Sequence, residues 1–140
     1  MRWLPFKQNS SRSAPHLELG ERGEKWAARH LARQGYKILV RHFRGKAGEI
    51  DIVARDRDFL VFVEVKTRKS ELFGPPSNAV DRKKQRHIAK VAFEYVRMLK
   101  DPRVNIRFDI VEVILDAGEA EPRDIRVIQN AFELPYPYQY

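Results

Sequence analysis

Two apolar runs joined by a short charged turn constrain the fold of this chain more than any other feature. The runs, Ile50 to Ala54 and Phe59 to Lys66, are rich in Val, Ile and Phe, and the turn is the polar cluster Arg55-Asp-Arg-Asp58. Polar clusters of this kind bound strands, so the pattern predicts a β-hairpin. Four charged side chains lie on or beside the apolar runs: Glu49, Asp51, Glu64 and Lys66.

The register of this hairpin decides whether those charges meet. Side chains alternate between the two faces of a strand, so Glu49 shares a face with Asp51, and Glu64 shares one with Lys66. A turn centred on Arg57-Asp58 sets Asp51 opposite Glu64. The same register sets Glu49 opposite Lys66, and all four charges then lie on one face.

Acidic residues directly opposite each other in a sheet are destabilising unless a cation lies between them. Mg²⁺ takes oxygen ligands and is commonly held by one or two carboxylates, with water and phosphate oxygens completing its shell. The pairing therefore predicts an Mg²⁺ or Mn²⁺ site at Asp51 and Glu64, where Lys66 would orient or help deprotonate a water. The alternative is that these charges form the solvent face of an antiparallel sheet.

Composition indicates one globular domain without thiol chemistry. The chain has 140 residues, of which 43% are hydrophobic and 33% charged, enough for a single core. It has no cysteine, which excludes disulfides, thiolate metal sites and a cysteine nucleophile. The histidines lack the spacing of a zinc-binding pair and are interpreted as structural or surface residues: His16, His30, His42 and His87.

The charge balance favours a polyanionic partner. A net charge of +8 and a pI near 9.9 indicate nucleic acid, most simply DNA, although an anionic membrane surface would attract the same charge. No apolar run reaches the length of a membrane span, so we expect no membrane role. The first residues, Met1 to Lys7, lack the features of a signal peptide, which predicts a cytoplasmic protein.

A helix is predicted from His16 to Gln34, after a flexible basic arm at residues 1–15. Its stripe of apolar and small residues contains Gly20 and Gly23, which would let the helix approach a sheet closely. Glu24 lies on the same stripe, so its carboxylate is expected to point toward the core. The alternative for Glu24 is a rim residue paired with an arginine.

The remaining elements complete an α/β domain of residues 16–133. Strands are predicted at Tyr36 to Phe43, Val104 to Leu115 and Ile125 to Ile128. A second helix is predicted from near Ser77 or Asn78, with Asp81 in its first turn, to about Leu99. The long strand becomes apolar on both faces past Phe108, which indicates the sheet interior. The expected order is α-β-β-β-α-β-β in a mixed sheet of four to five strands, with a Pro- and Tyr-rich tail at 134–140.

Basic residues cluster in two loops and in the second helix. We expect them to contact a nucleic-acid backbone, and the alternative for the helix is an ordinary solvated face. Lys84 and Gln85 would fall near the carboxylates if that helix packs beside the hairpin. The candidate contacts are Arg44, Lys46, Arg68, Lys69, Arg82, Lys83, Lys84, Gln85 and Arg86.

Several motifs in this order resemble a known family. They are Gly20-Glu-Arg-Gly-Glu24, Gly48-Glu-Ile-Asp-Ile-Val53, Phe62-Val-Glu-Val-Lys-Thr-Arg68, Lys84-Gln85, Arg107-Phe-Asp109 and Asn130-Ala-Phe132. They are similar to the YraN family of bacterial proteins, within the restriction-endonuclease-like PD-(D/E)XK superfamily, and the resemblance covers roughly residues 17 to 133. The family often has Asn where His42 stands, and Ile50 replaces the superfamily's proline.

The resemblance implies a fold related to archaeal Holliday-junction resolvases and a site formed by Glu24, Asp51, Glu64 and Lys66. Asp51 and Glu64 would bind Mg²⁺ or Mn²⁺, and Glu24 would complete the site. The expected function is a metal-dependent endonuclease acting on DNA, including branched structures, where a homodimer would suit a four-way junction. The alternatives are a non-catalytic nucleic-acid-binding module on the same fold, or a subunit that needs a partner for activity.

Overall fold

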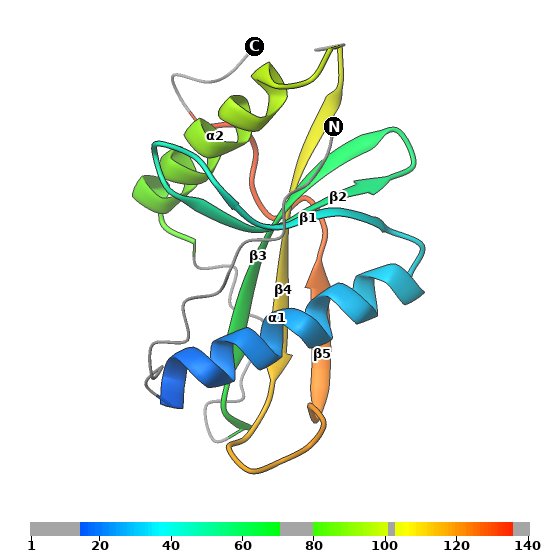
Figure 1. The fold of residues 1–140 in the computed structure, drawn as a ribbon, viewed down its shortest axis with the longest axis vertical. Helices are drawn as coiled ribbons and strands as arrows, with labels where there is room; N and C mark the ends of the chain where they lie inside the picture. The colour runs from blue at the N-terminus through cyan, green and yellow to red at the C-terminus, as the bar shows by residue number, and fades with distance from the viewer. Residues whose placement is uncertain (1–14, 71–79, 101–102, 136–140) are drawn as a thin grey trace.

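The computed structural model describes residues 15–70, 80–100 and 103–135, so the expected arm and tail lie almost wholly outside it. Within that part of the chain the order of elements is α-β-β-β-α-β-β, which confirms the predicted order (Figure 1). The elements are α1 (Pro15–Arg33), β1 (Lys37–Arg44), β2 (Glu49–Asp56), β3 (Phe59–Arg68), α2 (Arg82–Arg97), β4 (Asn105–Ile114) and β5 (Asp124–Ile128).

The strands form one sheet in the order β1-β2-β3-β4-β5. β2 pairs antiparallel with both β1 and β3. Arg57 and Asp58 form the β2–β3 turn, where the hairpin prediction centred it. β4 pairs parallel with β3, and β5 pairs antiparallel with β4. Because parallel neighbours need a crossover connection, the segment containing α2 lies between β3 and β4 in the chain. The sheet is therefore mixed.

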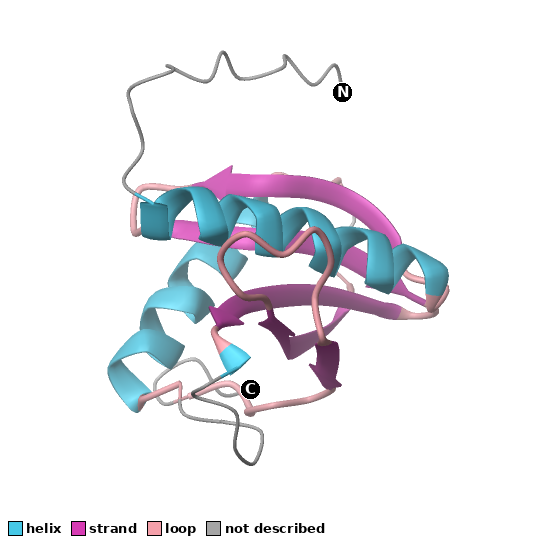
Figure 2. Ribbon diagram, turned by 90° about the horizontal axis from the view of Figure 1, so that it is seen from below, coloured by secondary structure: helices cyan, strands magenta, loops and turns pink. Residues whose placement is uncertain are grey.

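A separate apolar core lies on each face of the sheet. On one face, Ala27 and Leu31 of α1 are fully buried against strand residues such as Val63. On the other face, α2 contributes Tyr95, whose ring meets that of Phe62 edge-on at 5.9 Å between centroids. Figures 1 and 2 show α1 running across β3, β4 and β5, with α2 at the end of the β1–β2 hairpin. The two helices thus cover different regions of the sheet.

β4 is the most deeply buried strand. It lies between β3 and β5, and every residue from Phe108 to Ile114 is buried, as the apolar pattern predicts. Two of these residues, Asp109 and Glu112, carry carboxyl groups. Buried charges need partners, and Glu112 has one in Arg68, whose Nη1 lies 2.6 Å from Glu112 Oε1.

The start of α2 differs from the sequence-based expectation. The helix begins at Arg82, because the side chain of Asp81 accepts a hydrogen bond from the backbone N–H of Lys84 and caps the first turn. Asp81 is therefore the N-cap, and the predicted start at Ser77 or Asn78 is wrong, since Val80 and Asp81 are not helical. Residues 77–79 themselves lie outside the described ranges.

The close approach expected for the first helix occurs at Gly23. A Cβ at this position would overlap Oγ1 of Thr67 in β3 and lie 3.0 Å from Thr67 Cβ. Rotation of the threonine side chain would not relieve the contact fully, because its Cβ would stay 3.0 Å away. Gly23 therefore sets the distance between α1 and β3, and the next residue, Glu24, is brought against the sheet.

We expect Gly23→Ala to lower the free energy of unfolding by about 1–3 kcal/mol, the usual cost of overpacking. This loss would outweigh the gain of about 1 kcal/mol that alanine brings to a helix interior. Gly20→Ala is the matched control, because a Cβ there would meet nothing within 4 Å and should be stabilising. Urea denaturation of the two variants measures both effects. Equal stabilisation by both would contradict the close contact.

Candidate functional site

The candidate site lies where β2 separates from β3. The last paired residues of the β2–β3 ladder are Ile52 and Val63, and Asp51 and Glu64 come next on their strands. There the backbone N–H of Val65 donates to a side chain in place of a backbone partner. Its acceptor is Oδ2 of Asp51, at 2.8 Å. Asp51 therefore occupies the fork between the strands, where side chains from both faces of the sheet can meet.

The register of the hairpin is the predicted one, but its ladder ends at Ile52 and Val63, so neither predicted charge pair is part of it. Asp51 and Glu64 lie close enough that the charge of Asp51 raises the pKa of Glu64. Glu49 does not pair with Lys66, because the β2–β3 ladder does not extend that far. Instead Glu49 pairs with Arg44 of β1, and its Oε1 lies 2.9 Å from Nδ1 of His42.

The side chain of Glu24 points from α1 toward the sheet, the direction that its place on the helix stripe predicts, and it lies beside Asp51. Its side chain is only 15% exposed. Burial is the main cause that raises the pKa of Glu24 to about 8, and the charge and hydrogen bond of Asp51 raise it further. The pKa of Asp51 is also raised by burial, while its hydrogen bonds to Val65 and Glu24 act in the opposite direction. Glu24 therefore keeps the proton that the two carboxyl groups share.

Glu64 reaches the fork from β3. Burial, followed by the charge of Asp51, raises the pKa of Glu64 to about 7, and the nearby positive charges of Lys84 and Lys66 act against this rise. Nζ of Lys84 lies 3.5 Å from Glu64 Oε1, so α2 does bring this lysine to the carboxylates. The structure thus gathers Glu24, Asp51 and Glu64 with lysines beside them.

One carboxylate oxygen in this cluster has no hydrogen-bond partner. Oε2 of Glu24 is buried and accepts no hydrogen bond, although Nε2 of His42 lies 2.6 Å away. The positive charge of Arg41 lowers the pKa of Glu24, but burial raises this pKa by more. The close histidine nitrogen forms an ion pair with this oxygen when His42 is protonated, so the protein itself can supply a cation to the buried carboxylate.

The donor set fits an open site for a hard divalent ion. Among the described residues, no three His, Asp or Glu side chains are grouped so that they could hold a metal by themselves. Mg²⁺ does not require such a cage, because one or two carboxylates with water and phosphate oxygens suffice. The buried carboxylate of Glu24 and the raised pKa values of three neighbouring acids are consistent with that kind of site.

Without divalent ions, the stability of the protein should fall as the pH rises from about 4.5 to about 8. In this window Glu24 keeps its proton in the folded protein but loses it on unfolding, because its pKa rises from 4.5 to about 8. Folding then takes up a proton. For each proton taken up, the free energy of unfolding falls by up to about 1.4 kcal/mol per pH unit as the pH rises. Glu24→Gln should flatten this dependence, and the exposed Glu21→Gln should not. Denaturation with a chelator present, at several pH values, tests this, and parallel curves for all three proteins would contradict it.

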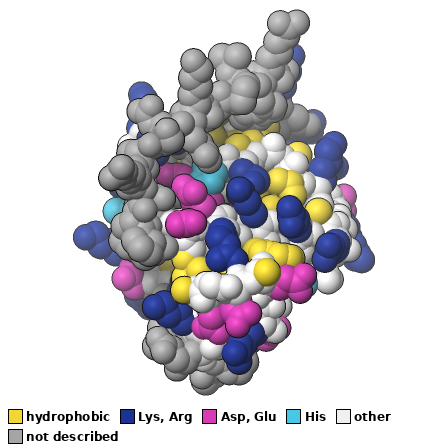
Figure 3. All heavy atoms as spheres, turned by 60° about the horizontal axis from the view of Figure 1, so that its bottom comes forward, with side chains coloured by type: hydrophobic (Ala, Val, Ile, Leu, Met, Phe, Trp, Pro, Cys, Tyr) yellow, Lys and Arg dark blue, Asp and Glu magenta, His cyan; other side chains and the backbone are white. Residues whose placement is uncertain are grey.

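The basic residues predicted to bind nucleic acid occupy several different surroundings. Arg82, Lys83 and Arg86 are exposed on α2, and Lys46 and Lys69 are exposed in loops. Others have protein partners: Arg44 lies 3.6 Å from Glu49, Arg68 pairs with buried Glu112, and Gln85 donates to the carbonyl of Val80. Figure 3 shows Lys and Arg interspersed with acidic side chains on the face in view. The structure therefore places Lys84, but not Gln85, at the carboxylates.

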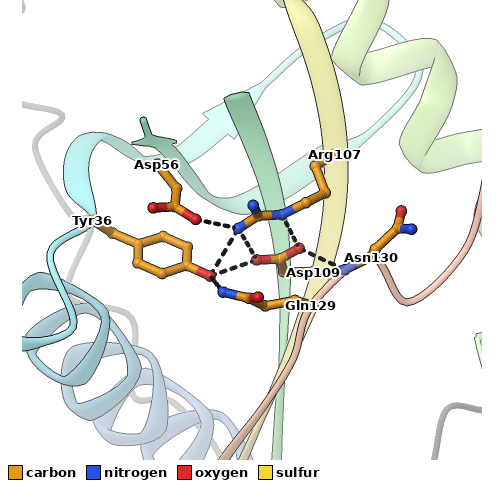
Figure 4. Close-up of polar contacts among 6 residues, drawn as sticks. All are labelled: Tyr36, Asp56, Arg107, Asp109, Gln129 and Asn130. Atoms are coloured by element: carbon orange, nitrogen blue, oxygen red, sulfur yellow. Dashed lines mark hydrogen bonds and ion pairs between the residues drawn. The ribbon is translucent and has the colours of Figure 1, made fainter. Parts of the chain in front are cut away.

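A second polar cluster surrounds Asp109 (Figure 4). Arg107 donates to both oxygens of Asp109 at 2.9 Å and to Asp56 at 2.8 Å. Tyr36 donates its hydroxyl proton to Asp109, and the backbone N–H of Asn130 donates to the same carboxylate. The Arg107-Phe-Asp109 motif therefore holds β2, β4 and the chain after β5 together.

A hollow of about 610 Å³ lies beside this second cluster. Its lining includes Tyr36, Arg107 and Phe59, and the guanidinium of Arg107 lies 5.2 Å from the Phe59 ring centre. Asp56 also lines it, five positions along β2 from Asp51, or about 17 Å at the rise of a strand. The hollow is thus separate from the carboxylate cluster.

Sequence reasoning missed His42 as part of the site. The histidines were interpreted as structural or surface residues, yet the ring of His42 contacts the carboxylates of both Glu24 and Glu49. The backbone φ of His42 is +54°, which is uncommon for a residue in a strand. No spacing rule reveals this contact, and the one signal in the sequence was the resemblance, which marks position 42 as a departure.

These observations define a mixed α/β protein with carboxylates and lysines gathered at a fork in its sheet. The profile of the uncharacterised protein family UPF0102 matches residues 23–113. A UPF0102 protein of Caldicellulosiruptor saccharolyticus is 48% identical over 115 residues, covering 82% of this chain and 97% of the relative. One from Syntrophus aciditrophicus is 43% identical over 125 residues, covering 89% of this chain and 96% of the relative. The chain belongs to the UPF0102 family, which confirms the family-level resemblance. Among the described helices, none is long and apolar enough to span a membrane.

Proposed function

We propose that this protein is a metal-dependent endonuclease that hydrolyses phosphodiester bonds in DNA, within the PD-(D/E)XK superfamily. The observation that carries the proposal is the meeting of Glu24 from α1, Asp51 from β2 and Glu64 from β3 at the fork of the sheet. Burial raises the pKa of all three acids, and the charge of Asp51 raises the pKa of Glu24 and Glu64 further. Such an arrangement is costly for folding and is typical of functional sites.

Asp51 and Glu64 would hold Mg²⁺ or Mn²⁺, and Glu24 would complete the ligand set. The ion would lower the pKa of a water and offset the charge on the scissile phosphate. Lys66 would position that water and add positive charge beside the phosphate. Glu24, whose pKa is raised to about 8 in the metal-free protein, would give up its proton when the ion binds.

Exposed basic residues would hold the DNA backbone. Arg82, Lys83 and Arg86 lie on the same helix as Lys84, which already reaches Glu64. Contacts to phosphates fix the position of a nucleic acid without reading its sequence. We therefore expect a preference for DNA shape, and branched DNA is the first substrate class to test. A homodimer would present two sites to a four-way junction.

A second candidate is a nucleic-acid-binding module without catalysis. The specific observation in its favour is that protein cations already approach the acids, with Lys84 at Glu64 and His42 at Glu24. On this alternative the carboxylates need no metal, and DNA binding would depend on salt but not on Mg²⁺ or Mn²⁺. A subunit that becomes active only with a partner would behave in the same way when alone.

Cleavage of a labelled panel of DNA tests the proposal. The panel contains single-stranded, duplex, flap and four-way-junction DNA, each incubated with Mg²⁺, with Mn²⁺ or with a chelator. Products that require the metal would support an endonuclease, and the substrate cut fastest would identify the preferred structure. Salt-sensitive binding of the same DNA without cleavage under any condition would favour the binding module.

A further inference from the structure

The hollow beside Asp109 contains hydrogen-bonding atoms that the polar network does not use. Among the described residues, the partners of Arg107 contact its Nε and Nη2, which leaves the N–H groups of Nη1 for another acceptor (Figure 4). The partner of Asp56 likewise contacts Oδ2, so its Oδ1 can still accept a hydrogen bond. Arg107 and Asp56 both line the hollow. Its wall therefore contains a donor and an acceptor that belong to one ion pair.

Phe59 adds an aromatic ring to the same wall. It is 39% exposed, and in the described part of the chain the other exposed large hydrophobic residue is Met98. The guanidinium of Arg107 lies 5.2 Å from the centre of the Phe59 ring, so the ring and the unused donors are neighbours. Exposure of apolar surface to water is unfavourable, and a ligand that stacks on the ring would remove that cost.

Two amides and an imidazole complete the wall. His30 and Gln34 lie at the end of α1, and Gln129 follows β5. An amide or a neutral imidazole both donates and accepts hydrogen bonds. Arg57, exposed in the β2–β3 turn, also lines the hollow and adds a positive charge. The hollow therefore combines donors and acceptors with one exposed cation beside them.

These features favour a nucleobase over a phosphate group. The charge of Arg107 is already balanced by Asp56 and Asp109, so the guanidinium does not attract a further anion strongly. A base is a neutral planar ring, and its edge carries both donors and acceptors. Proteins hold unpaired bases by stacking them on aromatic rings and by hydrogen bonds to those edges. The volume of about 610 Å³ lies within the usual range for sites of small ligands.

The distance from the carboxylate cluster indicates where such a base would lie along a DNA strand. Asp56 is about 17 Å from Asp51 at the rise of a strand. One strand of a duplex advances about 3.4 Å per nucleotide, so this distance corresponds to about five nucleotides, and to fewer in a stretched single strand. A base held in the hollow cannot be paired, because pairing occupies its edge and the neighbouring pairs occupy its faces.

We propose that the hollow holds an unpaired base of the DNA substrate, stacked on Phe59 and hydrogen-bonded to Arg107 and Asp56. The inference rests on the proposed function for the choice of DNA. It narrows the substrate to DNA that has a single-stranded segment within about five nucleotides of the bond that is cut. A flap or a splayed arm meets this requirement, whereas a continuous duplex does not.

The test measures binding of flap DNA with a chelator present, so that no strand is cut. A single abasic nucleotide is placed at successive positions of the single-stranded arm, whose register is fixed by the duplex junction. Wild type should lose about fivefold or more in affinity at one position, the effect expected when one stacked base is removed, and much less at the others. This readout requires no change to the protein.

Variants at position 59 assign the effect to the ring. Phe59→Leu should bind the intact flap about fivefold or more weakly and should show no position-dependent loss, whereas Phe59→Trp should behave like wild type because it keeps a stacking surface. Met98→Leu is the matched control, since it changes the other exposed hydrophobic residue, and it should bind like wild type. Urea denaturation checks that each variant folds.

The outcomes separate this inference from the proposed activity. Equal affinity of wild type for every abasic flap, or a position-dependent loss that persists in Phe59→Leu, would overturn the inference. Metal-dependent cleavage together with either result would leave the endonuclease standing without the base site. A loss at one position that Phe59→Leu abolishes, without cleavage under any metal, would support the base site and remove the proposed activity.

Discussion

Asp51→Asn is expected to abolish metal-dependent DNA cleavage, with a rate at least about a hundredfold below wild type. Loss of one group that stabilises developing charge typically costs this much or more. Asparagine keeps the size of the side chain, and its amide oxygen can still accept from the N–H of Val65, so the fork should persist. DNA binding should be retained, because the basic side chains on α2 and in the loops are untouched.

Asp58→Asn is the control for this prediction. Asp58 lies exposed in the turn of the same hairpin, so its substitution removes the same charge from the chain without touching the cluster. The measurement compares cleavage rates and salt-dependent binding of one flap or junction substrate by the three proteins. Cleavage by Asp51→Asn at the wild-type rate would remove Asp51 from the site, whatever activity the protein has.

The hairpin was predictable from sequence because its determinants are local. The turn at Arg57-Asp58 and the alternation of apolar residues set the register, and that register placed Asp51 next to Glu64. The same reasoning failed for Glu49 and Lys66, since it extended a regular ladder through a point where the strands separate. The Asp51 side chain takes up the N–H of Val65 there, and alternation does not reveal such a replacement.

Glu24 was predictable in direction but not in partner. The stripe of α1 indicated that its carboxylate faces the sheet, and Gly23 indicated a close approach. Its contact with His42 depends on how α1 crosses β1, and on a positive φ that no local pattern indicates. The start of α2 was missed for a simpler reason, because Asp81 is as suitable for an N-cap as for a first turn.

The network around Asp109 was visible in the sequence only as a motif without a role. Tyr36 and Asp109 are separated by 73 positions, and Arg107 and Asp56 by 51. Contacts over such separations follow from the order of strands in the sheet, and that order leaves many pairings open. The sequence showed a polar face at Arg107 and Asp109, but not that β2, β4 and the segment after β5 would meet there.

Asp109→Ala is expected to lower the free energy of unfolding by about 3–5 kcal/mol, the usual cost of breaking a buried ion pair. The Asp109 side chain is fully buried, and the Arg107 side chain is only 11% exposed. Removal of the carboxylate leaves the hydroxyl of Tyr36 and the N–H of Asn130 without their acceptor. Unpaired buried groups, more than the lost attraction, account for the size of the effect. Urea denaturation measures it.

Two further variants make this prediction specific. Arg123→Ala breaks an arginine–aspartate contact of 3.2 Å, but Arg123 is 65% exposed, so its stability should stay close to wild type. The double variant Arg107→Met with Asp109→Leu removes both charges of the pair but leaves the same two donors without an acceptor and Asp56 without its arginine, so its stability should also stay well below wild type. If Asp109→Ala and Arg123→Ala were equally mild, Asp109 would not hold the strands together. The Arg107-Phe-Asp109 motif would then need an explanation other than stability, and the adjoining hollow at Phe59 would be the first place to seek it.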